Sequence, residues 1–220
     1  MSFGIVIVNV DTDVPAADIV EAAAALQRQV LEHFFPAWGV SATVRAAVSS
    51  GIPKPEDWVL ELRRVPTIDG ALGVHQVTNT GQPLMLDFPT LDAQDGVAWT
   101  VTASHEILET LADPWLRRGA QDDQGTWWAI EVCDAVENDT YDIDGVAVSN
   151  FCLPAWAEPP VSRANARYDY LGLCTAPWEI RAGGYGQKFN AATNEWTQVG
   201  QMRAARRELN AIGLGRVARR

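Results

Sequence analysis

The first forty residues combine a continuous apolar run with a longer segment of helical periodicity. Residues 3–10 (FGIVIVNV) are almost entirely apolar, which predicts a buried strand. Between Ile19 and Phe34, apolar residues recur at three- and four-residue intervals, and Pro15 stands where the first turn of a helix accepts proline. We predict that this helix ends at residues 36–39 (PAWG), because proline and glycine interrupt helical periodicity.

Shorter apolar segments separated by turn residues follow this helix. They predict strands at residues 42–48, 58–62, 73–77 and 83–88. The sequence Asn79-Thr-Gly81 between the last two is typical of a hairpin turn. A second segment of helical spacing covers residues 97–112, and Asp113-Pro114 ends it because proline cannot continue a helix. Further strands are predicted at residues 127–132, 141–148, 168–173, 179–181 and 195–199.

This order of elements predicts an α+β protein whose second half is rich in strands and loops. A chain of 220 residues is long enough to bury one sizeable core. We therefore predict a single domain over residues 1–202, with subdomains at about 1–114 and 115–202. Residues 203–220 are predicted to form a basic C-terminal helix or tail.

Charge is distributed unevenly along the chain. The net charge is −11, but residues 203–220 hold six arginines against Glu208 alone, which gives +5 and leaves −16 for residues 1–202. An acidic body argues against nucleic-acid binding. The basic segment is predicted to be a solvated terminus; the alternative is a docking tail for an acidic partner.

The sequence has no signal for a membrane or for secretion. It lacks an apolar run of about eighteen residues, so we expect no membrane span. No basic segment precedes residues 3–10, so we expect no signal peptide. Cys133, Cys152 and Cys174 lack CxxC spacing, which argues against disulfides and against a thiolate zinc site. These features favour a reducing compartment, and thus a cytoplasmic or virion-associated protein.

The segment 104–109 (SHEILE) holds the chemistry of the second predicted helix. His105 and Glu109 are four residues apart, so they lie on one helical face and can bind one ion together. Glu106 projects roughly 100° away, where it can act on a metal-bound water instead. The arrangement is similar to the His-Glu-x-x-His helix of zinc peptidases, with a carboxylate in place of the second histidine.

The surroundings of this motif favour a metal site over a solvated surface helix. The face that holds His105 and Glu109 also holds Val101, Leu108 and Ala112, which are apolar. Buried carboxylates need a cation, and the sequence has no Lys or Arg between residues 64 and 117. The alternative is that His105 is merely a hydrogen-bonded partner of neighbouring acids.

Three segments resemble a known group of proteins: 105–109 (HEILE), 112–114 (ADP) and 131–134 (EVCD). The pattern is similar to that of zincin-like metallopeptidases, which include Exordium-like secreted plant proteins, microbial relatives and tailed-phage proteins. The resemblance implies a zincin-like α+β fold: a twisted mixed sheet with a backing helix, then a metal-site helix, then a second half that supplies the third ligand. Cys133 stands where relatives often have glycine, and Ala135 follows Asp134, so a disulfide of the secreted members does not transfer.

The third metal ligand is predicted to be Asp134 or Glu131. On a regular strand these two positions face opposite sides, so we expect one of them to reach the ion unless a bulge intervenes. We favour Asp134, because it lies where the strand gives way to an acidic turn. The alternative for either carboxylate is that it accepts a hydrogen bond from the ring of His105 and does not bind the ion. Asp113 points off the metal-binding face of the helix and is assigned a supporting role around the ligands.

The similarity to the zinc peptidase helix predicts Zn²⁺, whereas a ligand set of one histidine and two carboxylates makes Ca²⁺ or Mn²⁺ more competitive than at a histidine-rich site. In a peptidase mechanism, Glu106 would take a proton from the metal-activated water and deliver it to the leaving amine. Donors to the oxyanion are predicted among His75, Tyr168, Tyr170 and Tyr185. The strand that contains His75 is also a predicted edge on which an extended peptide or protein substrate could be added.

Two alternatives to a peptidase remain open from the sequence. One is a structural or interaction protein, for example a phage virion component, that retains a zincin-like fold and a structural metal site. The other is a small β-rich binding protein without a metal.

Overall fold

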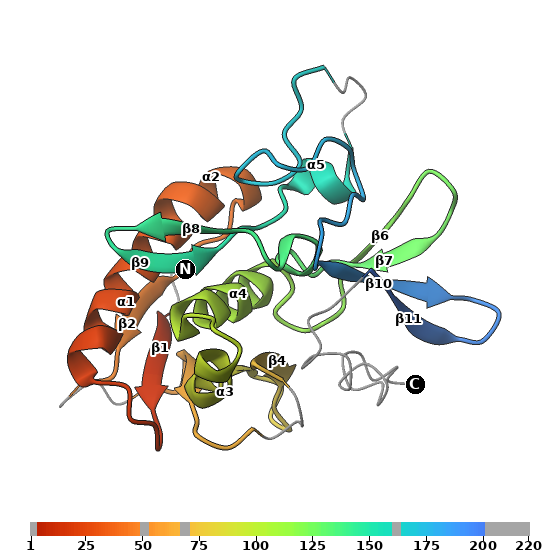
Figure 1. Cartoon of the computed structure of the whole chain (residues 1–220). Coiled ribbons are helices and arrows are strands. Elements are labelled where there is room, and N and C mark those ends of the chain that lie inside the picture. Colours follow the sequence, from red (N-terminus) through yellow and green to blue (C-terminus); the bar gives the residue numbers. More distant parts are fainter. Residues whose placement is uncertain (1–3, 49–52, 67–70, 160–163, 201–220) are drawn as a thin grey trace.

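The computed structural model describes residues 4–48, 53–66, 71–159 and 164–200. It has an α+β fold, in which a five-stranded sheet with two long helices is followed by a second half of short strands and loops (Figure 1). The α+β class predicted from the sequence is therefore confirmed. The basic segment predicted at 203–220 lies outside the described residues.

The main sheet has the strand order β2-β1-β3-β5-β4. Its strands are β1 (Gly4–Asn9), β2 (Thr43–Ala46), β3 (Trp58–Leu62), β4 (Gly73–Val77) and β5 (Pro83–Asp87). The first four in the order are parallel, and β4 pairs antiparallel to β5 with His75 opposite Met85. All five strands predicted for this half are present, and the predicted hairpin joins β4 to β5.

The first long helix is built from three consecutive pieces. Helix α1 (Ala16–Arg28) continues as a π-helix, η1 (Gln29–Phe34), and then as the short helix α2 (Phe35–Trp38). Gly39 ends it with φ 69°, a left-handed conformation that glycine adopts without steric cost. The predicted helix is thus present over its full length, with an irregularity that periodicity does not reveal.

The two long helices cover the same face of the sheet. Helix α1 packs on β2, whereas α4 (Trp99–Ala112) packs on β5 and β4. Alternate sheet residues share one core with residues of both helices: Ile5, Ile7, Leu60, Leu62 and Met85 with Leu26, Val30, Ile107, Leu108 and Leu111. A short helix that the sequence pattern did not predict, α3 (Pro89–Gln94), connects β5 to α4.

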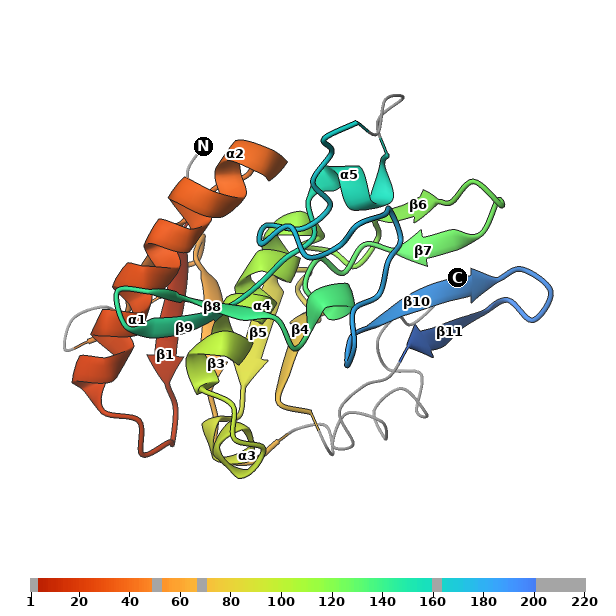
Figure 2. The same cartoon turned by 45° about the horizontal axis from the view of Figure 1, so that its top comes forward.

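The hairpin of β8 (Thr140–Ile143) and β9 (Val146–Ser149) lies over α1 and α4 on the side away from the sheet (Figures 1 and 2). Helix α4 is therefore enclosed between two layers, and every residue from 100 to 112 is buried. A helix buried around its whole circumference has no solvated face on which charged side chains could be exposed.

The rest of the second half consists of short elements beside this core. They are β6 (Gly119–Gln121), β7 (Trp127–Ala129), the 3-10 helix η2 (Asp134–Val136), α5 (Pro154–Ala157), β10 (Tyr185–Asn190) and β11 (Glu195–Gly200). Strands β11, β10, β7 and β6 form a second, antiparallel sheet in that order. Figure 2 shows the β10–β11 hairpin extending away from the main sheet.

Four predicted strands of this half were wrong or incomplete, and the first of them, 127–132, ends at Ala129. The segment 141–148 is a hairpin rather than one strand, because Asp144 and Gly145 both have positive φ and reverse the chain. The segment 168–173 forms a single bridge, between Asp169 and Cys152, and 179–181 is not a strand. The Asp169 carboxylate accepts hydrogen bonds from the Asn150 side chain and the Cys174 backbone amide, so side-chain bonds replace a strand ladder there.

Within the described ranges, every helix falls short of the length and apolar character that a bilayer span requires.

Candidate metal centre

Helix α4 carries three ionisable residues into the protein interior. His105, Glu106 and Glu109 are each only 3% exposed, although carboxylates rarely occupy such positions without a compensating partner. Among the described residues, the ion-pair partners of Glu106 and Glu109 are imidazoles alone. Folding therefore places these acids where water cannot solvate them and where, among the described residues, histidines are their ion-pair partners.

The ring of His105 lies between two carboxylates on its Nε2 side. Nε2 is 3.2 Å from Glu109 Oε1 and 3.3 Å from Asp134 Oδ1. Ligand atoms about 2.05 Å from a tetrahedral ion are about 3.3 Å apart, as follows from zinc–nitrogen and zinc–oxygen bond lengths. Asp134 Oδ1 is buried and makes no hydrogen bond among the described residues. His105 Nε2 thus has, on one side, two carboxylate oxygens at the distance that separates two ligands of one small cation. His105 and Asp134 also form, with Glu137, a group whose ligand atoms lie within 4.8 Å of one another.

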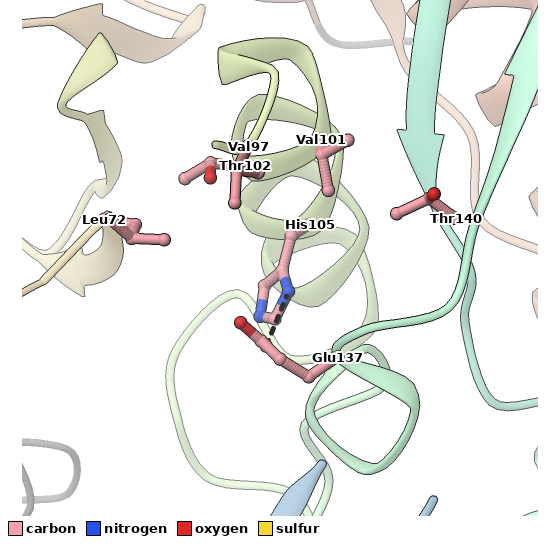
Figure 3. Close-up of a pocket in the computed structure, with 7 residues that line it drawn as sticks. All are labelled: Leu72, Val97, Val101, Thr102, His105, Glu137 and Thr140. Carbon is pink, nitrogen blue, oxygen red and sulfur yellow. Dashed lines mark ion pairs between the residues drawn. The ribbon is translucent and has the colours of Figure 1, made fainter. Parts of the chain in front are cut away.

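The opposite side of the same ring meets a residue that the sequence pattern did not single out. Glu137 Oε2 is 3.4 Å from His105 Nδ1. A metal-bound histidine usually donates its second ring N–H to a carboxylate, which fixes its tautomer and orientation. Figure 3 shows this pair beside a cavity of about 20 Å³, a size that can hold one water molecule. The cavity is lined by Leu72, Val97, Val101, Thr102, His105, Glu137 and Thr140.

A break in strand β7 brings both downstream acids toward the helix. The strand ends at Ala129, and the chain turns before η2 begins at Asp134, so Glu131 and Asp134 do not follow strand alternation. Within this turn the Cys133 amide donates a hydrogen bond to Glu109 Oε1 at 3.2 Å, which orients that carboxylate. The expectation that only one of the two acids reaches the cluster assumed a regular strand, which is not present here.

Close packing by a glycine holds η2 in place. A Cβ atom on Gly184 would lie 2.4 Å from the Ala135 carbonyl oxygen and 2.9 Å from that of Asp134. The Arg181 amide also donates to the Ala135 carbonyl at 2.8 Å. The loop before β10 therefore fixes the backbone that presents Asp134, and no larger residue fits at position 184.

His75 approaches the cluster from the sheet. It lies opposite Met85, whose side chain faces the helices, so the imidazole points toward α4. Its Nδ1 is 3.2 Å from Glu106 Oε2 and 3.4 Å from Glu109 Oε2, and its Nε2 is 3.5 Å from Glu131 Oε2. The sequence suggested His75 as an oxyanion donor, and the structure places it among three carboxylates.

Protonation of the two imidazoles offsets part of this negative charge in the metal-free protein. Burial alone lowers the pKa of His75, but the hydrogen bond with Glu106 and the charges of Glu131 and Glu109 raise it to about 10. Burial opposes a charge on His105 too, yet Glu109 and Glu137 raise its pKa well above its ordinary value. Burial and the neighbouring Asp134 raise the pKa of Glu109.

Cys133 is a further potential ligand, since its sulfur lies within 4.8 Å of ligand atoms of His105 and Glu109. Burial, followed by the charge of Glu109, raises the pKa of this thiol well above its usual range. Metals bind thiolates rather than thiols, so the Asp134 carboxylate is the better third ligand. All three cysteines are free and buried.

Other residues predicted for the site have different surroundings. Asp113 accepts hydrogen bonds from the amides of Arg117 and Arg118 at 2.9 and 2.7 Å, so it stabilises the turn after α4. Tyr168 is buried in the core, and Tyr170 stacks on Phe151 and on His33. Tyr185 begins β10, next to the loop that supports η2. Oxyanion donation by these tyrosines stays a prediction.

Comparisons with protein-family models, with curated proteins and with solved structures find no match to this chain.

Gly73 allows the sheet to approach α4 at the site. A Cβ there would lie 2.5 Å from Thr102 Cγ2 and 2.6 Å from Glu106 Oε1. We expect Gly73→Ala to lower the free energy of unfolding by about 1–3 kcal/mol, because overpacking displaces the Glu106 side chain. Urea denaturation measures this change. In a double-mutant cycle, Glu106→Ala should relieve part of the loss, and purely additive effects would contradict the proposed clash.

The raised histidine pKa values predict how the stability of the metal-free protein depends on pH. The folded state retains protons that the unfolded chain releases near pH 6.5, so the stabilisation is complete below pH 6.5 and is lost as pH rises toward about 10. We expect the free energy of unfolding to fall by on the order of 5 kcal/mol over this range. Urea denaturation of chelator-treated protein measures it, with His75→Gln as the comparison that should flatten the profile. A stability that increases with pH would contradict this assignment.

Proposed function

We propose that this protein is a metal-dependent peptidase, in which His105, Glu109 and Asp134 hold one divalent ion and Glu106 is the general base. The observation that carries this proposal is the position of His105 Nε2, which has two carboxylate oxygens at 3.2 and 3.3 Å. Zn²⁺ suits this spacing best, and Mn²⁺ or Ca²⁺ would also accept the oxygen ligands.

The position of Glu106 supports a catalytic role separate from metal binding. Its carboxylate and that of Glu109 both contact His75 Nδ1, at 3.2 and 3.4 Å, so the two acids are close neighbours. Among the described residues Glu106 thus lies beside the ligands and pairs with His75, whereas His105 pairs with Glu109. The His75 ring holds the Glu106 carboxylate in one orientation, as general-base catalysis requires.

A bound divalent ion would polarise a peptide carbonyl and acidify a water molecule. Glu106 would accept the proton of that water and return it to the departing amine. His75, whose Nδ1 contacts Glu106, would keep the base oriented in both steps. Strand β4, which ends the sheet order, would pair with an extended peptide and align it along α4.

The fold supports a zincin-like relationship at the level of arrangement. A mixed sheet backed by a long helix comes first along the chain and the helix of the candidate metal centre follows, which is the order that the resemblance implies. The same order is compatible with unrelated activities, so the proposal depends on the side chains of the site and not on the fold.

The substitution Glu106→Gln tests the mechanism. The amide keeps the shape of the side chain but cannot take a proton, so we expect peptide cleavage to fall by about 10²- to 10⁴-fold while zinc remains bound. Mass spectrometry of a peptide mixture measures cleavage, and elemental analysis measures zinc. Glu56→Gln, at an exposed position, is the control. Unchanged cleavage in the Glu106 variant would refute the proposed base.

Burial of the whole cluster favours a second candidate function, a structural metal site in a non-catalytic protein such as a virion component. His105, Glu109 and Asp134 are each 3% exposed, and closed coordination is typical of structural ions. In that case zinc would raise the thermal stability, no peptide would be cleaved, and Glu106→Gln would change neither property strongly.

A further inference from the structure

Glu109 presents its two carboxylate oxygens to two different imidazoles. Oε1 is 3.2 Å from His105 Nε2, and Oε2 is 3.4 Å from His75 Nδ1. A carboxylate that points each oxygen at a separate group of ligands has the geometry of a bridge between two metal ions. In sites with two metals the ions are about 3.5–4 Å apart, a distance that one bridging carboxylate spans.

The second group of ligands is compact. His75, Glu109 and Glu131 can each supply one ligand atom such that all three atoms lie within 4.8 Å of one another. The His75 side chain is 10% exposed, and its Nε2 makes no hydrogen bond among the described residues. Nδ1 is hydrogen-bonded with Glu106, so Nε2, which faces the Glu131 carboxylate at 3.5 Å, is the ring nitrogen that His75 can offer to an ion.

The negative charge of the cluster also favours two divalent ions over one. Five carboxylates converge here, from Glu106, Glu109, Glu131, Asp134 and Glu137, all of them buried. One divalent ion leaves a formal charge of −3 when both imidazoles are neutral, and two ions leave −1. Buried sites avoid uncompensated charge of either sign, so the two-ion state is the better balanced one.

We propose a second divalent-metal site formed by His75, Glu131 and the second oxygen of Glu109, so that Glu109 bridges two ions. The inference rests on the proposed site at His105, Glu109 and Asp134, to which it adds a neighbour. Glu106 then lies beside the pair of ions, and Glu137 supports His105 from the opposite side of its ring.

Titration of the metal-free protein with Zn²⁺ alone tests the stoichiometry. Calorimetry and elemental analysis should find two ions per chain in the wild type and one in His75→Gln and in Glu131→Gln. His33→Gln is the matched control, because His33 bonds to Tyr141 and stacks on Tyr170, and it should retain two ions. One ion in the wild type, or two in His75→Gln, would overturn the second site.

Manganese provides a test that needs no variant. Two Mn²⁺ ions bridged by Glu109 are magnetically coupled, so the electron paramagnetic resonance spectrum of the loaded wild type should show exchange coupling. Two independent six-line signals, or one, would overturn the bridge even if the variants fail to fold. The outcome is distinguishable from failure of the proposed function: a single ion with Glu106-dependent cleavage removes only the second site, whereas two ions without cleavage remove only the peptidase.

Discussion

Replacement of His105 by alanine is expected to lower the affinity for zinc by roughly a hundredfold to a thousandfold. Structural zinc sites bind with about 10–16 kcal/mol from four ligands, so one ligand contributes roughly 3 kcal/mol. In this protein the substitution removes His105 Nε2, the nitrogen that lies 3.2 Å from Glu109 and 3.3 Å from Asp134. Competition with a fluorescent zinc chelator measures the affinity.

Two further variants separate the loss of a ligand from weaker effects on zinc affinity. Glu137→Gln removes the charge behind the His105 ring without removing a ligand, so its affinity should fall by only about 10- to 100-fold. His33→Ala removes a histidine outside the cluster and should leave the affinity unchanged. Equal affinities for wild type and His105→Ala would exclude His105 as a ligand, and with it the proposed centre.

Removal of the metal is expected to destabilise the protein substantially. A ligand present at about a thousand times its dissociation constant stabilises the folded state by about 4 kcal/mol. For a chain of this size, that corresponds to a fall in melting temperature of roughly 8–16 °C when the ion is removed. The physical cause is that the buried carboxylates repel one another once the cation is absent.

Differential scanning calorimetry with zinc and with a chelator measures this shift. The His105→Ala variant is the internal control, because it should lose the part of the shift that comes from the ion at His105, Glu109 and Asp134. Identical melting temperatures for the wild type in zinc and in chelator would contradict a metal that binds the folded state. A shift without peptide cleavage would favour the structural function over the peptidase.

Local pattern predicted most of the first half of the fold. The five strands of the main sheet and both long helices follow from apolar spacing, and Asp113-Pro114 ends α4 as expected. In the second half the pattern was weaker. Residues 168–173 alternate like a strand, yet the Asp169 carboxylate binds backbone and side-chain amides, which decides the conformation.

For the candidate site, too, the sequence predicted one part and the tertiary structure decided the rest. Helical spacing alone places His105 and Glu109 on one face, and the apolar neighbours of that face indicate burial. Glu131 and His75 were candidates from the sequence, but Glu137 was not. Periodicity could not place any of the three, because each reaches the cluster through a contact that is distant in the sequence. Gly73 and Gly184 also shape the site, because a side chain at position 73 would collide with Glu106 and one at position 184 with the backbone of η2.

The sequence by itself determined the α+β order and the helix that pairs an imidazole with a carboxylate, because both depend on spacing within single elements. Only the tertiary structure decided which other acids meet that helix and that a second imidazole joins them. The reason is physical: a strand that ends at Ala129 and a sheet pressed against α4 are products of packing between layers, and no local periodicity encodes where two layers touch.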